Sequence, residues 1–130
     1  MLCLDYLIAN RDRHGSNLEV LRNEDDESIR LAPLFDQGVS LLFSTYGDET
    51  QIDNTDVMRD FQVNNYIGSR SLLYNLSLIP KSYNLKIKSL KKEDKAYIFQ
   101  NVDKILTQKH IDKIWELIWK RWCYFAEIRS

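Results

Sequence analysis

The sequence reads Asn10-Arg11-Asp12-Arg13-His14-Gly15-Ser16-Asn17 directly after a short apolar segment, and it reads Phe35-Asp36-Gln37-Gly38 further on. The first stretch is polar and contains a glycine, which is typical of a loop. Between the two stretches, apolar and polar residues alternate at 18–21 and 29–31 on either side of an acidic run, which predicts a β-hairpin with a solvated turn. An antiparallel hairpin returns the chain to its starting edge, so we expect the two polar stretches to meet.

Three side chains in these stretches form a pattern suited to phosphoryl transfer. This reaction needs a carboxylate near the attacking hydroxyl and two oxygen ligands that hold magnesium against the phosphates. In protein kinases an Asp, an Asn about five residues later and a further Asp before Gly have these roles. Asp12, Asn17 and Asp36 reproduce that order and approximate spacing. The alternative interpretation is that the two aspartates are loop-capping carboxylates and that Asn17 is accidental.

Two longer motifs surround these residues. They read Asp5-Tyr6-Leu7-Ile8-Ala9-Asn10-Arg11-Asp12-Arg13-His14-x-x-Asn17 and Leu31-Ala32-Pro33-Leu34-Phe35-Asp36-x-Gly38. Together they resemble the HipA-like serine/threonine kinases, and the first is also similar to the catalytic loop of phosphoinositide 3-/4-kinases. The Ala-Pro-x-Phe-Asp segment and the short hairpin favour protein substrates over lipids. The marked resemblance covers residues 5–42, and the rest of the chain is weakly compatible with the family's helical C-terminal region.

The resemblance implies a role for each motif residue. Asp12 would accept the proton of the substrate hydroxyl, and Asn17 and Asp36 would bind the Mg²⁺ that bridges the phosphates of ATP. The cofactor-binding residues that shape the loop would be Asn10, Arg13 and His14. The alternative interpretation of His14 is a structural hydrogen-bonding residue. Gln37 replaces the Phe of the familiar Asp-Phe-Gly triplet, so a switch based on packing of that Phe is not expected.

A kinase also needs a glycine-rich loop over the phosphates and a strand lysine that grips them. The 4 glycines are too scattered for such a loop, and Asp12 follows closely on Met1. We therefore expect the C-terminal catalytic lobe of a HipA-like kinase, as a fragment, a truncated product or a subunit whose N-terminal lobe is a separate chain. Alone, it is expected to have little or no kinase activity and to use Mg²⁺ and ATP only with a complementing N-terminal lobe.

This interpretation implies partners. They would be a separate N-terminal lobe or an antitoxin-like protein chain, together with a protein substrate. Self-association at the N-terminal edge is the alternative, because Met1, Leu2 and Leu4 would expose apolar surface there.

Two other functions compete with the kinase. The first is a non-catalytic protein-binding module, or a truncated remnant with the same fold, that uses the helix of Trp115, Trp119 and Trp122. Such large aromatics are more often core residues. The second is nucleic-acid binding by the basic second half, but its lysines are spread along a helix and its approach rather than clustered. These lysines are Lys86, Lys88, Lys91, Lys92 and Lys95.

The fold class expected is α+β and mostly α-helical, a kinase-like C-lobe with a catalytic loop, a β-hairpin and a C-terminal helical bundle. Residues 1–130 would form one domain. Its expected parts are a catalytic and metal-binding segment at 1–43, a polar loop region at 44–65 and a helical part at 66–130.

Several helices are expected from the apolar pattern. They are the end of a buried helix at 2–8, a short helix or two at 66–79, a helix at 93–105, and a last helix with Thr107 as its N-cap. The last helix carries an amphipathic stripe made of Ile111, Ile114, Trp115, Ile118, Trp119, Trp122, Phe125 and Ala126. Residues 44–56 are polar and turn-rich, which predicts a mobile loop.

Composition agrees with an ordinary folded domain: 130 residues, 44% hydrophobic and 28% charged. No apolar run reaches the ~20 residues of a membrane span, and the first residues lack the pattern of a signal peptide, so we expect a cytoplasmic location. Cys3 and Cys123 are expected to be buried or half-buried free thiols, since a disulfide would suit a secreted chain. Residues 1–60 carry 13 acidic and 5 basic side chains and residues 61–130 carry 6 and 13, which favours attraction between two parts of one domain.

Overall fold

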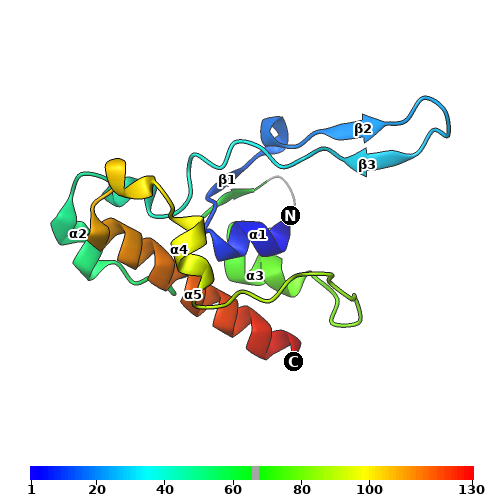
Figure 1. Ribbon diagram of the computed structural model, residues 1–130. Coiled ribbons are helices and arrows are strands. Elements are labelled where there is room, and N and C mark those ends of the chain that lie inside the picture. The colour runs from blue at the N-terminus through cyan, green and yellow to red at the C-terminus, as the bar shows by residue number, and fades with distance from the viewer. Residues whose placement is uncertain (66–67) are drawn as a thin grey trace.

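Helix α5, Gln108–Arg129, is the longest element of the computed structural model, which describes residues 1–65 and 68–130 (Figure 1). It begins where the sequence predicts, because the Thr107 side chain accepts a hydrogen bond from the amide of His110 and so caps the first turn. The fold is a small α+β fold. Helices α1 and α2 and the 3₁₀ turn η3 all contact α5.

The hydrophobic core lies between α5, α1 (Leu2–Leu7) and α3 (Leu72–Ser77). Helix α1 confirms the helix expected at the start of the chain. Ser71 caps helix α3, because its hydroxyl accepts a hydrogen bond from the amide of Tyr74. The buried members of the core are Cys3, Tyr6, Ala9, Leu42, Val57, Val63, Leu72, Leu76, Ile114, Leu117 and Phe125.

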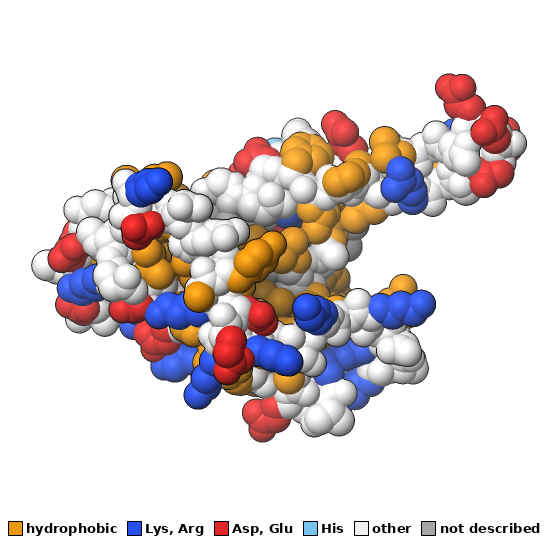
Figure 2. Space-filling model, viewed as in Figure 1, with side chains coloured by type: hydrophobic (Ala, Val, Ile, Leu, Met, Phe, Trp, Pro, Cys, Tyr) orange, Lys and Arg blue, Asp and Glu red, His pale blue; other side chains and the backbone are white. Residues whose placement is uncertain are grey.

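The predicted hairpin is present and projects away from the helices (Figure 1). Strand β2 (Val20–Arg22) pairs antiparallel with β3 (Ile29–Leu31), and Val20 lies opposite Leu31. The residues of both strands are exposed. Figure 2 shows hydrophobic side chains along the hairpin and acidic side chains at its far end.

A second pair of strands was not expected. Strand β1 (Asp12–Arg13) pairs in parallel with β4 (Asn64–Asn65), although both segments were expected to be loops. Two-residue strands are too short to show the alternation of apolar and polar residues by which a strand is recognised. The pairing places residue 64 beside the motif at residues 10–17, since the amide of Asn64 also donates to the carbonyl of Arg11 at 2.7 Å.

The prediction of a mobile loop at 44–56 is wrong for much of that segment. A 3₁₀ turn, η2 (Phe43–Thr45), is followed by helix α2 (Glu49–Asn54). Asp48 caps this helix, because its side chain accepts from the amides of Thr50 and Gln51. Ile52, only 1% exposed, anchors the helix in the interior.

The single helix expected at 93–105 is interrupted. Helix α4 covers Asp94–Ile98, and η3 covers Val102–Lys104. Between them Asn101 adopts a left-handed backbone with φ 63°, which asparagine tolerates better than most residues. The expectation for 66–79 is met by α3, while residues 66 and 67 lie outside the described part of the chain.

The buried face of α5 differs from the apolar stripe in the sequence. It consists of His110, Ile111, Ile114, Leu117, Arg121 and Phe125. Trp115, Trp119 and Trp122 are half-buried beside this face, and the first two stack with ring centroids 5.7 Å apart. Leu117 and Arg121 were missing from the expected stripe. The tryptophans therefore form the border of the core rather than its centre.

Arg121 is buried because its charge is surrounded by backbone carbonyls. Its Nε donates to Val57 at 2.9 Å, its Nη1 to Tyr6 at 3.0 Å and its Nη2 to Arg59 at 2.7 Å. Burial lowers the pKa of the Arg121 guanidinium. The three bonds tie α5 to the end of α1 and to residues 57–59, which lie next to the motif.

Both cysteines are free thiols, as expected. Cys3 is buried, and this burial raises the pKa of its thiol. The expected burial of Cys123 is wrong, because this residue is exposed on α5. In the part of the chain that the structure describes, no helix has both the length and the apolar character needed to cross a bilayer.

Candidate functional site

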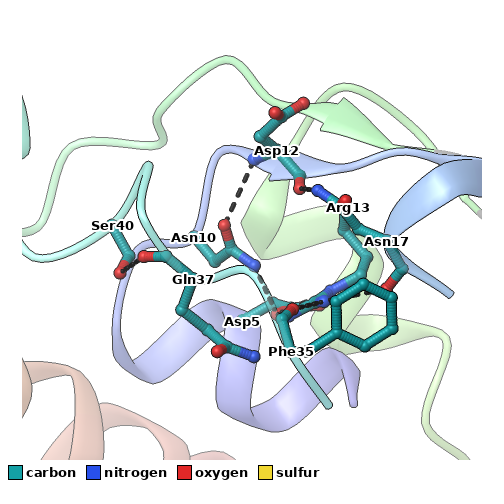
Figure 3. Close-up of polar contacts among 8 residues, drawn as sticks. All are labelled: Asp5, Asn10, Asp12, Arg13, Asn17, Phe35, Gln37 and Ser40. Carbon is teal, nitrogen blue, oxygen red and sulfur yellow. Dashed lines mark hydrogen bonds and ion pairs between the residues drawn. The ribbon is translucent and has the colours of Figure 1, made fainter. Parts of the chain in front are cut away.

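A buried ion pair lies beneath the motif. Asp5 on α1 and Arg13 on β1 are each 1% exposed, and Arg13 Nη2 lies 2.8 Å from Asp5 Oδ1 (Figure 3). Arg13 Nε also donates to both carboxylate oxygens, at 3.3 and 3.2 Å. A guanidinium that meets a carboxylate through several nitrogens is held in one orientation. This pair therefore fixes β1 against α1.

The same guanidinium joins the two polar stretches. Arg13 Nη1 donates to the carbonyl of Asn17 at 3.1 Å and to the carbonyl of Phe35 at 2.9 Å. These carbonyls lie on the two sides of the hairpin, so one cation holds its base closed. The sequence predicted that the stretches meet, and the structure brings them together at this side chain.

Residues 39–41, which follow the hairpin, run antiparallel to residues 8–11. The amide of Arg11 donates to the carbonyl of Val39 at 2.9 Å, and the amide of Leu41 donates to the carbonyl of Ile8 at 2.9 Å. Asp36 lies shortly before this segment, directly after Phe35, whose carbonyl binds Arg13.

Asn10 is part of the buried network. It is 0% exposed, its Nδ2 donates to Asp5 Oδ1 at 3.0 Å, and its Oδ1 accepts from the amide of Asp12 at 3.2 Å. The polar atoms of Asn10 and the nitrogens of Arg13 are thus used inside the protein. Both residues therefore shape the loop from below, through contacts inside the protein.

Asp12 points away from this network toward the surface (Figure 3). Its side chain is 31% exposed, and its Oδ1 accepts from Asn64 Nδ2 at 3.1 Å. Its Oδ2 lies 3.5 Å from Nε2 of His14. His14 Nδ1 accepts from the amide of Ser16 at 3.2 Å, which leaves the proton of a neutral ring on Nε2, facing Asp12. The carboxylate is accessible, and two neighbours restrict its orientation.

Asn17 is buried and oriented by its own loop. It is 4% exposed, and its Nδ2 donates to the carbonyl of Asp12 at 2.9 Å. Because the nitrogen is used in this way, the amide oxygen is the atom available for a ligand. Oxygen is the donor that Mg²⁺ prefers.

Asp36 is exposed and has a left-handed backbone with φ 52°. Its carboxylate turns back over the following residues, since its Oδ1 lies 3.6 Å from the position that a Cβ on Gly38 would occupy. A side chain at position 38 would touch this carboxylate, and glycine leaves the space beside it open.

The oxygen atoms proposed as magnesium ligands come from only two side chains. Asn17 and Asp36 provide oxygens, and Mg²⁺ in nucleotide sites is commonly bound by one or two carboxylates, several waters and the phosphates themselves. Among residues 1–65 and 68–130, no group of three or more His, Cys, Asp or Glu side chains could hold a metal ion. An ion bound by Asn17 and Asp36 would therefore need further ligands from outside these two side chains.

Two residues of the site were not found from the sequence. Asp5 pairs with Arg13, and the available signal was an acidic residue inside an otherwise apolar helix. Asn64 binds Asp12 from a segment that is 52 positions away in the sequence, and no local pattern indicates that contact.

Comparison of the chain with protein-family models, with curated proteins and with solved structures gives no match. The proposals below therefore rest on the motif and on the geometry of the site.

The buried pair gives a prediction for stability. Asp5→Asn keeps the shape of the side chain but leaves the Arg13 charge without its partner, so we expect the free energy of unfolding to fall by about 3–5 kcal/mol. Glu27→Gln breaks the exposed pair with Arg22, in which the side chains are 63% and 77% exposed, and should have little effect. Urea unfolding followed by circular dichroism measures both, and equal losses would contradict the structural role of Asp5.

Proposed function

We propose that this chain is the catalytic-loop lobe of a HipA-like protein serine/threonine kinase, which transfers a phosphoryl group from ATP with Mg²⁺. The observation that supports it is the position of the Arg13 guanidinium. It binds the carbonyls of Asn17 and Phe35, and so gathers the segments of the three motif residues at one place. A pair of unrelated loop-capping carboxylates would not need that arrangement.

In this proposal Asp12 binds the hydroxyl of a serine or threonine in a protein substrate and accepts its proton. His14 and Asn64 hold the carboxylate in position, which is the requirement for general base catalysis. Asn17 and Asp36 would hold the metal ion. When bound, Mg²⁺ supplies positive charge that offsets the charge of the phosphates.

The proposal requires a nucleotide-binding lobe from outside these residues. The 130 residues contain 4 glycines and no glycine-rich loop of the kind that covers phosphates in kinases. We therefore propose that ATP binds productively only when a complementing lobe is present. The chain alone should show little or no transfer of phosphate.

A manganese titration tests the metal site in the chain itself. Mn²⁺ substitutes for Mg²⁺ and broadens the NMR signals of nearby amides, so we expect broadening at residues 12–17 and 35–38. Asp36→Asn and Asn17→Ala should each weaken it, because the first removes the negative charge of a ligand and the second deletes an oxygen ligand. The matched control is Asp25→Asn in the hairpin turn, which should leave this broadening unchanged. Broadening confined to the acidic hairpin turn would contradict the proposed site.

A second experiment tests catalysis, with this chain joined to the nucleotide-binding lobe of a HipA-like kinase. Asp12→Asn should lower kcat by roughly 100-fold to 10,000-fold, the usual range for loss of a general base. The Mn²⁺ broadening should persist in the same variant, because Asp12 is not a proposed ligand. Full phosphotransfer by the Asp12→Asn protein, or by the isolated chain at an ordinary kinase rate, would overturn the proposal.

A second candidate function is a protein-binding module, and the hairpin favours it. Val20 and Ile29 are 68% and 69% exposed and lie on one face of an isolated two-stranded ribbon, beside Leu31 at 46%. A two-stranded hairpin is marginally stable by itself in water, and exposed apolar patches mark interaction sites. We propose that a second protein covers this face. It would be the nucleotide-binding lobe, an antitoxin-like chain or a second copy of this chain.

Light scattering at high protein concentration tests the case of a second copy. If copies pair through the hairpin, the wild-type mass should exceed that of one chain, and the double variant Val20→Thr/Ile29→Thr should restore the monomer mass while keeping residues that favour strands. The control is Ile105→Thr, at a residue that is 72% exposed but far from the hairpin in sequence. A monomer at all concentrations would exclude self-association and leave a different partner.

A further inference from the structure

A cavity of about 290 Å³ opens beside the motif, between residues 42–45, helix α2 and the segment that follows α2. Two arginines line it, Arg11 and Arg59, together with the rings of Phe43 and Phe61. Arg11 directly precedes Asp12, but the cavity does not include Asp12. The proposed phosphoryl-transfer chemistry makes no use of these side chains.

The Arg11 side chain is held between two aromatic rings. Its guanidinium carbon lies 5.7 Å from the centroid of Phe43 and 5.8 Å from that of Phe61. Its Nε donates to the carbonyl of Gln62 at 3.4 Å. The two terminal nitrogens make no hydrogen bond or ion pair with a described residue. These contacts orient the cation and leave its fork free for an acceptor.

Arg59 brings a second charge to the same ring. Its guanidinium carbon lies 5.7 Å from the centroid of Phe61, and its side chain makes no ion pair or hydrogen bond within the described chain. Arg121 adds a third, 5.4 Å from that centroid, although its nitrogens are already used on backbone carbonyls. Three cations thus surround one phenylalanine.

Opposing charge in the cavity is limited. Asp56 also lines it, and its Oδ1 accepts from the amide of Met58 at 2.9 Å. No carboxylate in the described residues lies within ion-pair distance of Arg11 or Arg59. Like charges held close together at a partly enclosed site favour the arrival of an anion. Arginine is the side chain best suited to phosphate, because its planar fork can donate two parallel hydrogen bonds.

We infer that this cavity binds a phosphate group, with Arg11 and Arg59 as its two ligands. The source is either free inorganic phosphate or a phosphorylated side chain of a peptide, and both present the same oxyanion. The inference is independent of the metal site and of nucleotide binding, so either proposal can fail without the other.

The test is an NMR titration of the chain with inorganic phosphate at constant ionic strength, maintained with chloride. The side-chain Nε–H signals of Arg11 and Arg59 should shift and saturate. Arg11→Gln and Arg59→Gln should each weaken binding roughly 10-fold or more, which is the effect of losing one hydrogen bond between charged groups. Arg30→Gln, at an exposed arginine of the hairpin outside the cavity, is the matched control and should leave the affinity unchanged.

A loss of phosphate binding can be distinguished from a loss of folded protein. Within residues 1–65 and 68–130 the Arg59 side chain makes no hydrogen bond, so Arg59→Gln breaks none there and should keep the wild-type circular dichroism even if Arg11→Gln does not. A phosphoserine peptide that binds more tightly than inorganic phosphate would identify a phosphorylated protein as the source, and equal affinity would identify free phosphate. Absence of saturation, equal loss in Arg30→Gln, or equal binding of acetate would overturn the inference.

Discussion

The ion pair between Asp5 and Arg13 is the constraint on which the arrangement of the site depends. Its side chains are 1% and 2% exposed, whereas every other ion pair among the described residues includes a side chain at least 34% exposed. Removing two charges from water costs several kcal/mol per ion, so such a pair is retained only where further hydrogen bonds compensate. Here they do, because the same guanidinium binds the carbonyls of Asn17 and Phe35.

Three consecutive residues of the motif consequently have three different surroundings. Arg13 lies in the interior and fixes the loop, Asp12 reaches the surface beside Asn64 and His14, and Arg11 enters the neighbouring cavity. Successive side chains of an extended backbone point in opposite directions, which turns Asp12 away from both of its neighbours. The proposed general base therefore borders the cavity that we propose binds an anion.

The sequence predicted features that depend on neighbouring residues. The alternation of apolar and polar residues around an acidic turn predicts the hairpin. Thr107 predicts the start of α5, because an N-cap is a local interaction. Features that depend on distant partners were missed. The pairing of β1 with β4 joins two-residue segments far apart in the chain, and Arg121 is buried only because carbonyls from two other segments surround it. For the same reason the sequence marked Asn10 and Arg13 as residues that shape the loop but did not identify Asp5, the buried partner of both. Helix α2 is a different case. Its capping residue, Asp48, is present in the sequence, but the polar composition of residues 44–56 led to the prediction of a loop.

Hydrogen exchange of the Arg13 side chain tests the central claim most directly. The Nε–H proton of Arg13 is buried against Asp5, so NMR should show that it exchanges with water only through opening of the structure. The Nε–H of Arg22, whose side chain is 63% exposed, should exchange far faster in the same sample. If the Arg13 proton exchanged as rapidly as that of Arg22, the guanidinium would not be holding the base of the hairpin, and the account of the site would be wrong.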